Sequence, residues 1–433
     1  MAVKLTLDSF AKESVNGDEK YLQRIKNTPV TQSEFDSLSG KFNYVGVTDR
    51  FKDVIETFKN DPNQTPAGFK RELVLEDKVL KVDLIRDISY DKNGELRPTN
   101  VLFSADSANP YEIAPMKDLI ANLTCNPGIV YDLFINNPNA NIGNQFKNRD
   151  EVMQEIAKIL GPEVDISIEL NNPFEQDFNM ILEEAEKFKE MFSEYRVVIK
   201  VPHTGAVNEG NVHELLTNDK KLSANFKDLK TKDAFYSHNL CLKLQEAGYR
   251  INYTLMFEPY QTNLALQAKP YFINTFLRQR LLQSQTIEEY LLAFEATQNV
   301  VHLSNLKQYL YDIDYLSNKD MSIELIEVYK EAKSLIKYRE LSNKEGLDGL
   351  DGMRHNLRCL KNCNLGDTRL IVCSMEGEDN YPDIDKLLTE PEFLELNKKV
   401  VVTTEPAYFS RFTSTHQVTT YQRRFMNAVQ GQN

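Results

Sequence analysis

Residues 196–205 read Arg196-Val197-Val198-Ile199-Lys200-Val201-Pro202-His203-Thr204-Gly205, with a lysine inside a run of apolar, β-branched residues. Such a run predicts a buried strand that ends where proline, threonine and glycine follow. A buried amine is costly unless it is paired, and burial lowers its pKa, which makes a lysine nucleophilic towards carbonyl groups. The alternative is a lysine at a strand end whose amine reaches water. The rest of the chain has to decide between the two.

The chain has 433 residues, of which 41% are apolar, enough for one large domain with appendages or for two to three domains. Its 51 basic and 64 acidic residues give a net charge of −13. This balance argues against a general surface for nucleic acid or anionic membranes, although it is compatible with a local basic pocket. The first residues lack the apolar core of a signal peptide, and no run of 18 apolar residues occurs. We therefore expect a cytoplasmic protein without nucleic-acid or membrane partners.

Five cysteines lie at positions 125, 241, 359, 363 and 373. Cys359 and Cys363 follow His355 in a His-x3-Cys-x3-Cys pattern. A tetrahedral metal site needs a fourth ligand that no second cluster supplies, so packing on a helix face is the expected role. Reduced thiols agree with a cytoplasmic location.

Residues 1–97 differ in pattern from the rest of the chain. Short helical patterns occur at Lys20–Lys26 and Phe51–Lys59, and one alternating, strand-like segment runs over Glu72–Ile85. Asp91-Lys92-Asn93-Gly94 is typical of a turn between strands. We expect a mixed N-terminal extension of helix and β-hairpin over 1–97, a barrel over 98–415 and a C-terminal tail over 416–433.

From about residue 98, short apolar runs alternate with helical patterns, which is typical of an α/β fold. The expected strands are Val101–Asp106, Ala121–Cys125, Val164–Glu169, Val197–Val201, Tyr249–Met256, Pro270–Phe276, Thr368–Ser374 and Lys399–Thr404. Eight strands with intervening helices predict a (β/α)8 TIM barrel. The alternative is an open doubly wound sheet, but the sequence has neither G-x-G-x-x-G nor a P-loop. The longest connection, 277–366, is expected to be a helical insertion or lid between strands 6 and 7.

Polar residues stand at the carboxyl ends of these strands, where barrels carry their reactive groups. Those expected to converge on one mouth are Asp106, Asn126, Glu169, Lys200, Asn252 and Thr254. Two carboxylates beside an amine suit formation and dehydration of a carbinolamine, followed by proton transfer during carbon–carbon bond cleavage. Taken singly, the acids could cap turns or pair with lysines, and the asparagines could form turns. Their joint placement favours a reactive site.

Seven blocks of sequence resemble transaldolase and the related fructose-6-phosphate aldolase-like enzymes. They are Asp106-Ser107-Ala108-Asn109, Leu123-Thr124-Cys125-Asn126-Pro127, Ser167-Ile168-Glu169, Val198-Ile199-Lys200-Val201-Pro202, Gly248–Phe257, Tyr271–Phe276 and Val402-Thr403-Thr404-Glu405-Pro406. Their order and spacing cover roughly 98–415. The resemblance implies a transferase of the pentose phosphate pathway type in carbohydrate metabolism. Such an enzyme moves a three-carbon dihydroxyacetone unit from a ketose or ketose phosphate to an aldose through a lysine Schiff base.

The resemblance also implies a role for each matching residue. Lys200 would form the Schiff base, and Asp106 would act as general acid and base. Glu169 and Thr254 would hold and activate the water of imine formation and hydrolysis. Sugar binding would fall to Thr124, Asn126, Asn252, Asn274, Phe276, Arg280 and Ser374. The imine serves as the electron sink, so we expect neither a metal nor an organic cofactor. Sugars are then the expected partners, and the sequence leaves open whether the chain forms a homodimer.

The positions at which the family binds phosphate differ in this chain. Gln279, between Arg278 and Arg280, replaces the arginine after the sixth strand, and Glu376 stands where a cation follows the seventh. A carboxylate repels phosphate, whereas arginine binds it through paired hydrogen bonds. Three alternatives stay open: a substrate without phosphate, a phosphate held by another cation such as Arg280, and a barrel kept for binding or assembly without turnover. For the two arginines, helix-end ion pairs are as compatible with the sequence as phosphate contacts. For His203 we favour a solvated loop over a proton shuttle.

Overall fold

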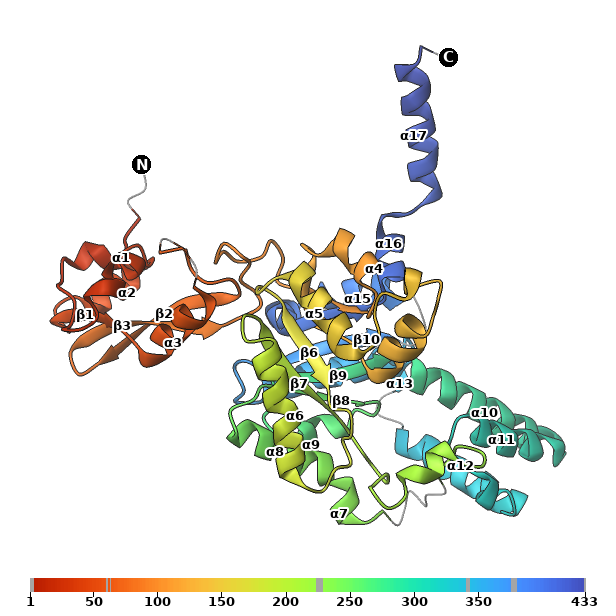
Figure 1. Cartoon of the computed structure of the whole chain (residues 1–433). Coiled ribbons are helices and arrows are strands. Elements are labelled where there is room, and N and C mark those ends of the chain that lie inside the picture. The colour runs from red at the N-terminus through yellow and green to blue at the C-terminus, as the bar shows by residue number, and fades with distance from the viewer. Residues whose placement is uncertain are drawn as a thin grey trace.

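The computed structural model describes residues 4–59, 61–62, 64–222, 229–339, 343–374 and 380–431. Its centre is a closed barrel of eight parallel strands in the order β10-β11-β4-β5-β6-β7-β8-β9 (Figure 1). The strands are β4 (Leu102–Asp106), β5 (Ile120–Thr124), β6 (Asp165–Glu169), β7 (Arg196–Pro202), β8 (Ile251–Thr254), β9 (Phe272–Leu277), β10 (Arg369–Ser374) and β11 (Val400–Thr404). The predicted (β/α)8 barrel is confirmed, with every strand end within two residues of its expected place.

Helices cover the outside of the barrel. They are α4 (Pro110–Ile113), α5 (Arg149–Leu160), α6 (Phe178–Met191), α8 (Tyr236–Glu246), α9 (Gln261–Gln267), α14 (Asp351–Lys361), α15 (Asn380–Leu388) and α16 (Pro406–Thr413). Ile199 and Val201 of β7 are buried in the core between strands and helices, whereas Val198 belongs to a separate cluster inside the barrel. Because side chains alternate along a strand, Arg196 and Lys200 share the inward face with Val198. One strand thus carries a cation into each end of the barrel.

The N-terminal extension forms a small three-stranded sheet in the order β1-β3-β2. Its elements are β1 (Tyr44–Val47), α3 (Asp49–Phe58), β2 (Phe69–Glu76) and β3 (Val79–Arg86), after the short helices α1 (Leu22–Ile25) and α2 (Gln32–Leu38). Phe42, Phe51 and Leu80 are among the residues of a core of its own. Figure 1 shows this unit beside the barrel.

The single strand expected over 72–85 is wrong. Asp77 and Lys78 both have positive φ values, 47° and 61°, and reverse the chain between β2 and β3. The resulting antiparallel pair runs from Phe69–Arg86 at one end to Glu76–Val79 at the other. Asp-Lys is a weaker turn signal than Asn-Gly, so the alternating pattern hides the break. The turn at 91–94 lies instead between the bridge partners Tyr90 and Leu96.

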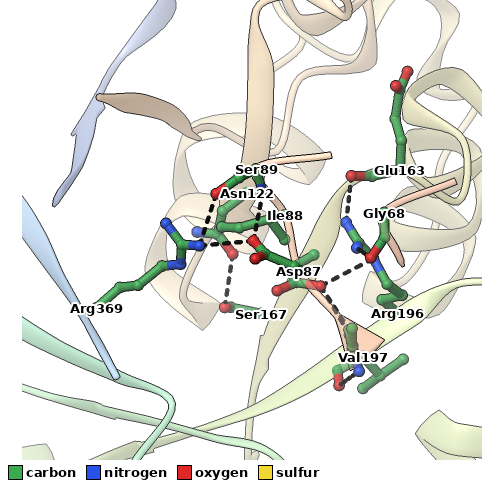
Figure 2. Close-up of polar contacts among 12 residues, drawn as sticks. Gly68, Asp87, Ile88, Ser89, Asn122, Glu163, Ser167, Arg196, Val197 and Arg369 are labelled. Carbon is green, nitrogen blue, oxygen red and sulfur yellow. Dashed lines mark hydrogen bonds and ion pairs between the residues drawn. The ribbon is translucent and has the colours of Figure 1, made fainter. Parts of the chain in front are cut away.

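Buried arginines join the extension to the amino-terminal end of the barrel (Figure 2). The Arg196 guanidinium donates hydrogen bonds to the carbonyl oxygens of Gly68 and Glu163. Gly68 has a φ of 71°, and a Cβ there would lie 1.7 Å from Arg196 Nη1, so both backbone conformation and space require glycine. Arg369 donates to Asp87 Oδ1 at 2.8 Å and to Ser89 Oγ at 2.8 Å.

Asp165 is the acid at the centre of this junction. It is fully buried, and its Oδ1 accepts a hydrogen bond from Arg86 Nη2 at 2.8 Å and lies 3.2 Å from Arg196 Nε. Burial alone would raise the pKa of Asp165, but the charges of Arg86 and Arg196 outweigh burial and lower it. Arg86 belongs to the extension and Arg196 to the barrel, so one carboxylate links the two.

The insertion between β9 and β10 is helical, as expected, and three of its helices form an arm. Its helices are α10 (Gln279–Thr297), α11 (Val301–Asp312) and α12 (Leu325–Arg339). Ile287, Leu306 and Val328 belong to a separate apolar core within it. The arm and the C-terminal helix α17 (His416–Val429) both extend away from the barrel (Figure 1). Across the described ranges, no helix combines the length and apolar character that crossing a bilayer requires.

Candidate active site

A cavity of about 530 Å³ opens at the carboxyl ends of the barrel strands. Eight of the eleven expected site residues line it, namely Asp106, Thr124, Asn126, Glu169, Lys200, Thr254, Asn274 and Phe276. They come from β4, the β5 end, β6, β7, β8 and β9. The barrel therefore brings together residues that are up to 170 positions apart (276 − 106).

Lys200 and Glu169 are the closest charged pair in this cavity. They are partners in the register of β6 and β7, and Lys200 Nζ lies 2.9 Å from Glu169 Oε2. Lys200 is 8% exposed. Burial lowers the pKa of Lys200, but the attraction of Glu169 and Asp106 outweighs burial, so its pKa is raised. The lowered pKa expected from burial alone is wrong because the strand pairing supplies carboxylates.

The pKa of Asp106 is raised above that of an ordinary surface acid. Burial raises its pKa to about 6, with Glu405 and Glu169 adding repulsion and Lys200 opposing them. Its Oδ1 is buried and has no hydrogen-bond partner among the described residues. A carboxyl group with a pKa of about 6 can both accept and return a proton near neutral pH.

Glu169 and Asp106 are therefore placed to exchange protons with the amine of Lys200. At rest, Lys200 is protonated and paired with Glu169. Attack on a carbonyl needs the neutral amine, so a carboxylate has to take the proton first. Asp106, whose pKa lies closer to neutrality than that of a surface acid, is a suitable acceptor.

Neutral polar side chains complete the wall of the cavity. Thr124 is 5% exposed, Thr254 3% and Asn274 3%. Asn274 Oδ1 is buried without a protein partner in the described part of the chain, so it can accept a substrate hydroxyl. Asn126 Oδ1 accepts from the Ile129 backbone N–H at 2.9 Å, which is the turn role that the sequence left open.

An aromatic pair forms the apolar part of the wall. Phe276 stacks on Phe257 with ring centroids 4.3 Å apart. Leu255, which also lines the cavity, has a φ of 64°, a costly conformation for a leucine. It turns the chain directly after Thr254, the last residue of β8.

Asn252 lies below the mouth rather than in its wall. It is fully buried, and its Nδ2 donates to Ser167 Oγ at 3.2 Å. Ser167 donates to Asn122 Oδ1 at 3.2 Å, and Asn122 donates to Ser104 Oγ at 2.8 Å. This polar chain crosses the barrel interior, and Asn252 is the register partner of Lys200 on β8 without lining the cavity itself.

Arg280 does not line the cavity, because its guanidinium is held elsewhere. Its Nε lies 2.9 Å from Glu258 Oε2, and a second nitrogen pairs with Asp351. Arg278 pairs with Asp383 in the same way. Both arginines thus form the ion pairs that the sequence offered as the alternative to phosphate binding.

Two further expected positions lie at the end of β10. Ser374 is the last residue of that strand, and its side chain lies outside what the structure describes. Glu376 lies outside the described residues.

The structure adds lining residues to which sequence reasoning gave no role. Glu405 directly follows β11, and Thr403 and Cys373 lie on β11 and β10. Glu405 could have been found from the rule that identified Asp106, since both carboxylates stand at a strand end. Burial raises the pKa of Cys373, so this thiol remains protonated.

The histidines and clustered thiols lie apart from the cavity. His203 Nδ1 lies 2.9 Å from Tyr253 Oη and its ring stacks on that tyrosine, so it is packed rather than solvated. Burial lowers the pKa of His203 to about 4. Cys359 contacts His355 at 3.4 Å, and the described residues contain no group of three or more side chains that could hold a metal.

The closed parallel barrel carries a buried lysine among carboxylates at the end where such barrels place their reactive groups. Residues 103–219 match the family model described as Transaldolase/Fructose-6-phosphate aldolase, so this segment is similar to that family. The match covers Asp106, Glu169 and Lys200 and ends before Thr254. A search of curated proteins finds no match to the chain.

Proposed function

We propose that Lys200 forms a Schiff base with a ketose and that the protein transfers a three-carbon dihydroxyacetone unit to an aldose acceptor. The observation that carries this proposal is the buried Lys200 amine, 2.9 Å from Glu169 and electrostatically coupled to Asp106 at the mouth of the barrel. The family match to the segment that holds all three residues supports aldolase-type chemistry.

The proposed reaction begins when the neutral Lys200 amine attacks the ketose carbonyl carbon and forms a carbon–nitrogen bond. Loss of water from the carbinolamine gives the protonated imine, with Glu169 and Thr254 holding the departing water. Asp106 then takes the proton of the C4 hydroxyl as the C3–C4 bond breaks, and the electron pair of that bond passes into the enamine. An aldehyde leaves. Addition of the acceptor aldehyde and hydrolysis of the imine reverse these steps.

A second candidate is the same chemistry on sugars without phosphate. The described residues that line the mouth contain one cation, Lys200, against three carboxylates, Asp106, Glu169 and Glu405. The arginines nearest in sequence to the family's phosphate position are paired with acids. A phosphate in this cavity would meet repulsion that a neutral hydroxyl would not.

Borohydride trapping tests both candidates. Reduction converts the imine to a stable secondary amine, so intact mass and peptide mapping should show a substrate-sized adduct on Lys200. The ketose panel should include matched pairs with and without phosphate. Adducts from both members of a pair would support the transaldolase proposal, and adducts from the unphosphorylated sugars alone would favour the second candidate.

No adduct with any ketose, from protein whose folding circular dichroism confirms, would contradict the enzyme proposal. It would favour the third alternative, a barrel kept for binding or assembly. The Lys200→Met variant is the matched control, since it removes the amine but keeps a side chain of similar length.

A further inference from the structure

A second cavity, of about 390 Å³, lies at the opposite end of the barrel, between the N-terminal extension and the barrel. Its lining contains six cations, Lys70, Arg86, Arg97, Arg369, Lys398 and Lys399, and two carboxylates, Asp87 and Asp367. In a chain whose net charge is −13, this is a local reversal of sign. Such a cluster is unfavourable unless acids or a bound anion compensate it.

The acids of the protein compensate only part of this charge. Arg86 is matched by Asp165, Arg369 by Asp87 and Lys70 by Glu72. No ion pair is described for Lys398, whose side chain is at the surface.

Lys399 is also without a carboxylate partner in the described chain. Its Nζ donates to the carbonyl oxygens of Leu365 at 3.0 Å and Gly366 at 3.2 Å. Burial lowers the pKa of Lys399, and repulsion from Arg369 and Lys398 lowers it further. An anion in the cavity would relieve that repulsion.

Arg97 is a third under-compensated cation. Its Nε donates to the Ile88 carbonyl oxygen at 3.0 Å, and the nearest carboxylate oxygen, from Glu163, lies 3.9 Å from its Nη2. Burial lowers the pKa of Arg97, as expected for a charge that lacks a close counter-ion.

A neutral donor lies in the same wall. Tyr271 is 6% exposed, lines the cavity, and its hydroxyl is buried without a hydrogen-bond partner among the described residues. Burial raises the pKa of Tyr271, so the hydroxyl keeps its proton and acts as a donor. A buried hydroxyl with no partner costs free energy, which a ligand oxygen would recover.

We propose that this cavity, which we call the base site, binds a small phosphate-type anion between the extension and the barrel. Lys398, Lys399 and Arg97 provide the charge, and Tyr271 donates a hydrogen bond to an anion oxygen. The volume fits a free phosphate or a small phosphorylated molecule. Because the cations come from both units, a bound anion also stabilises the junction. This site is independent of the chemistry proposed at the mouth.

Isothermal titration calorimetry of the full chain tests the base site. The probes are inorganic phosphate, and glucose 6-phosphate against glucose, with sodium chloride at equal ionic strength as the reference. Titrations in the Lys200→Met background exclude imine formation at the mouth. We expect phosphate to bind where chloride does not. Tighter binding of glucose 6-phosphate than of phosphate would identify a phosphorylated molecule as the ligand, and the reverse order would identify the free ion.

Three variants locate the binding. Lys398→Ala with Lys399→Ala should weaken phosphate binding at least tenfold, because two charge-assisted contacts are lost. Tyr271→Phe should weaken it about tenfold while keeping the ring. The matched control is Lys337→Ala, which removes one exposed charge from the arm and should leave affinity unchanged.

Two results would overturn the proposal. The first is phosphate binding no stronger than that of chloride to the unaltered base site. The second is unchanged phosphate affinity in the folded double-lysine variant, which would place the anion elsewhere. Neither depends on activity at the mouth, so failure here and failure of the Schiff-base proposal are distinguishable.

Discussion

The two ends of the barrel place the same kinds of charge in opposite arrangements. At the amino-terminal end, the carboxylate of Asp165 lies between two arginines, whereas at the mouth one lysine lies among three carboxylates. Strand β7 supplies a cation to each end, Arg196 and Lys200, and both are buried. The two ends differ in the sign of the charge that is in excess. Surplus cations at one end favour an anion, and surplus carboxylates at the other favour movement of protons.

The pKa directions of two buried acids express this contrast. The pKa of Asp165 is lowered because Arg86 and Arg196 outweigh its burial. The pKa of Asp106 is raised to about 6 because burial and neighbouring acids outweigh Lys200. Asp165 is fully buried and Asp106 lines the cavity, but burial raises the pKa of both, so the local balance of charge decides whether an acid stabilises the fold or exchanges protons.

Lys200→Met should have the largest effect on the comparison. The borohydride adduct should be lost completely, because no other lysine lines the mouth in the described structure. Mass spectrometry of the trapped protein measures this. An adduct that persists in the variant would show that another amine of the chain is the reactive group.

Asp106→Asn should reduce turnover by about 10²- to 10⁴-fold, the usual contribution of a general acid or base. The asparagine keeps the shape but exchanges no proton. Steady-state kinetics should show the loss in kcat, measured with a donor sugar that gives the Lys200 adduct in the trapping experiment. Imine trapping should be slower but not lost, since Glu169, 2.9 Å from Lys200, can still accept the amine proton. Unchanged kcat would assign the proton transfer to another group.

Asp165→Asn should lower the free energy of unfolding by about 3–5 kcal/mol, because it leaves two buried arginines without their counter-ion. Urea denaturation measures this. Asn122→Ser, which alters the neutral polar layer, is the comparison that keeps all buried charges. A loss smaller for Asp165→Asn than for Asn122→Ser would mean that the junction charges are not mutually stabilising.

The pH dependence of stability should have opposite signs at the two ends. Ionising Asp106 costs stability as pH rises from about 4 to about 6, up to roughly 3 kcal/mol. Asp106→Asn should therefore become more stable than the natural protein across that range. Asp165 stabilises above its unfolded pKa of about 3.9, so the deficit of Asp165→Asn should shrink only below pH 4. If the comparison is wrong, urea titrations at several pH values would show that both acids change the free energy of unfolding in the same direction as pH rises.

Arg280→Lys should have the smallest effect. It keeps one positive charge for Glu258 and Asp351 but loses the paired geometry of a guanidinium. We expect KM for phosphorylated and unphosphorylated ketoses to stay in the same ratio. A selective rise in KM for phosphorylated donors would show that Arg280 contacts the substrate phosphate.

Much of the fold and of the mouth was predictable from local sequence. Apolar runs mark the eight barrel strands, and the polar residues that end them mark the cavity, because strand ends of a parallel barrel share one edge. The β2–β3 turn was missed because Asp77-Lys78 is a weak turn signal, and the short polar run Glu76-Asp77-Lys78 is compatible with a single strand.

Electrostatics was less accessible from the sequence. The raised pKa of Lys200 depends on the register that places Glu169 opposite it, and that register is a property of two strands. The partners of Arg280 likewise come from β8-to-α9 and α14 segments 22 and 71 positions away. Pairing across such distances leaves no local pattern to interpret.

The contact between Arg369 and Asp87 spans 282 positions of the chain. At roughly 5–20 residues per second of synthesis, Asp87 is synthesised about 14–56 s before its partner (282/20 to 282/5). The extension is therefore complete during most of translation, while the barrel surface on which it docks has not yet been made. Its own apolar core around Phe51 and Leu80 suits that interval, because it lets the first-made unit fold before the ring of strands closes.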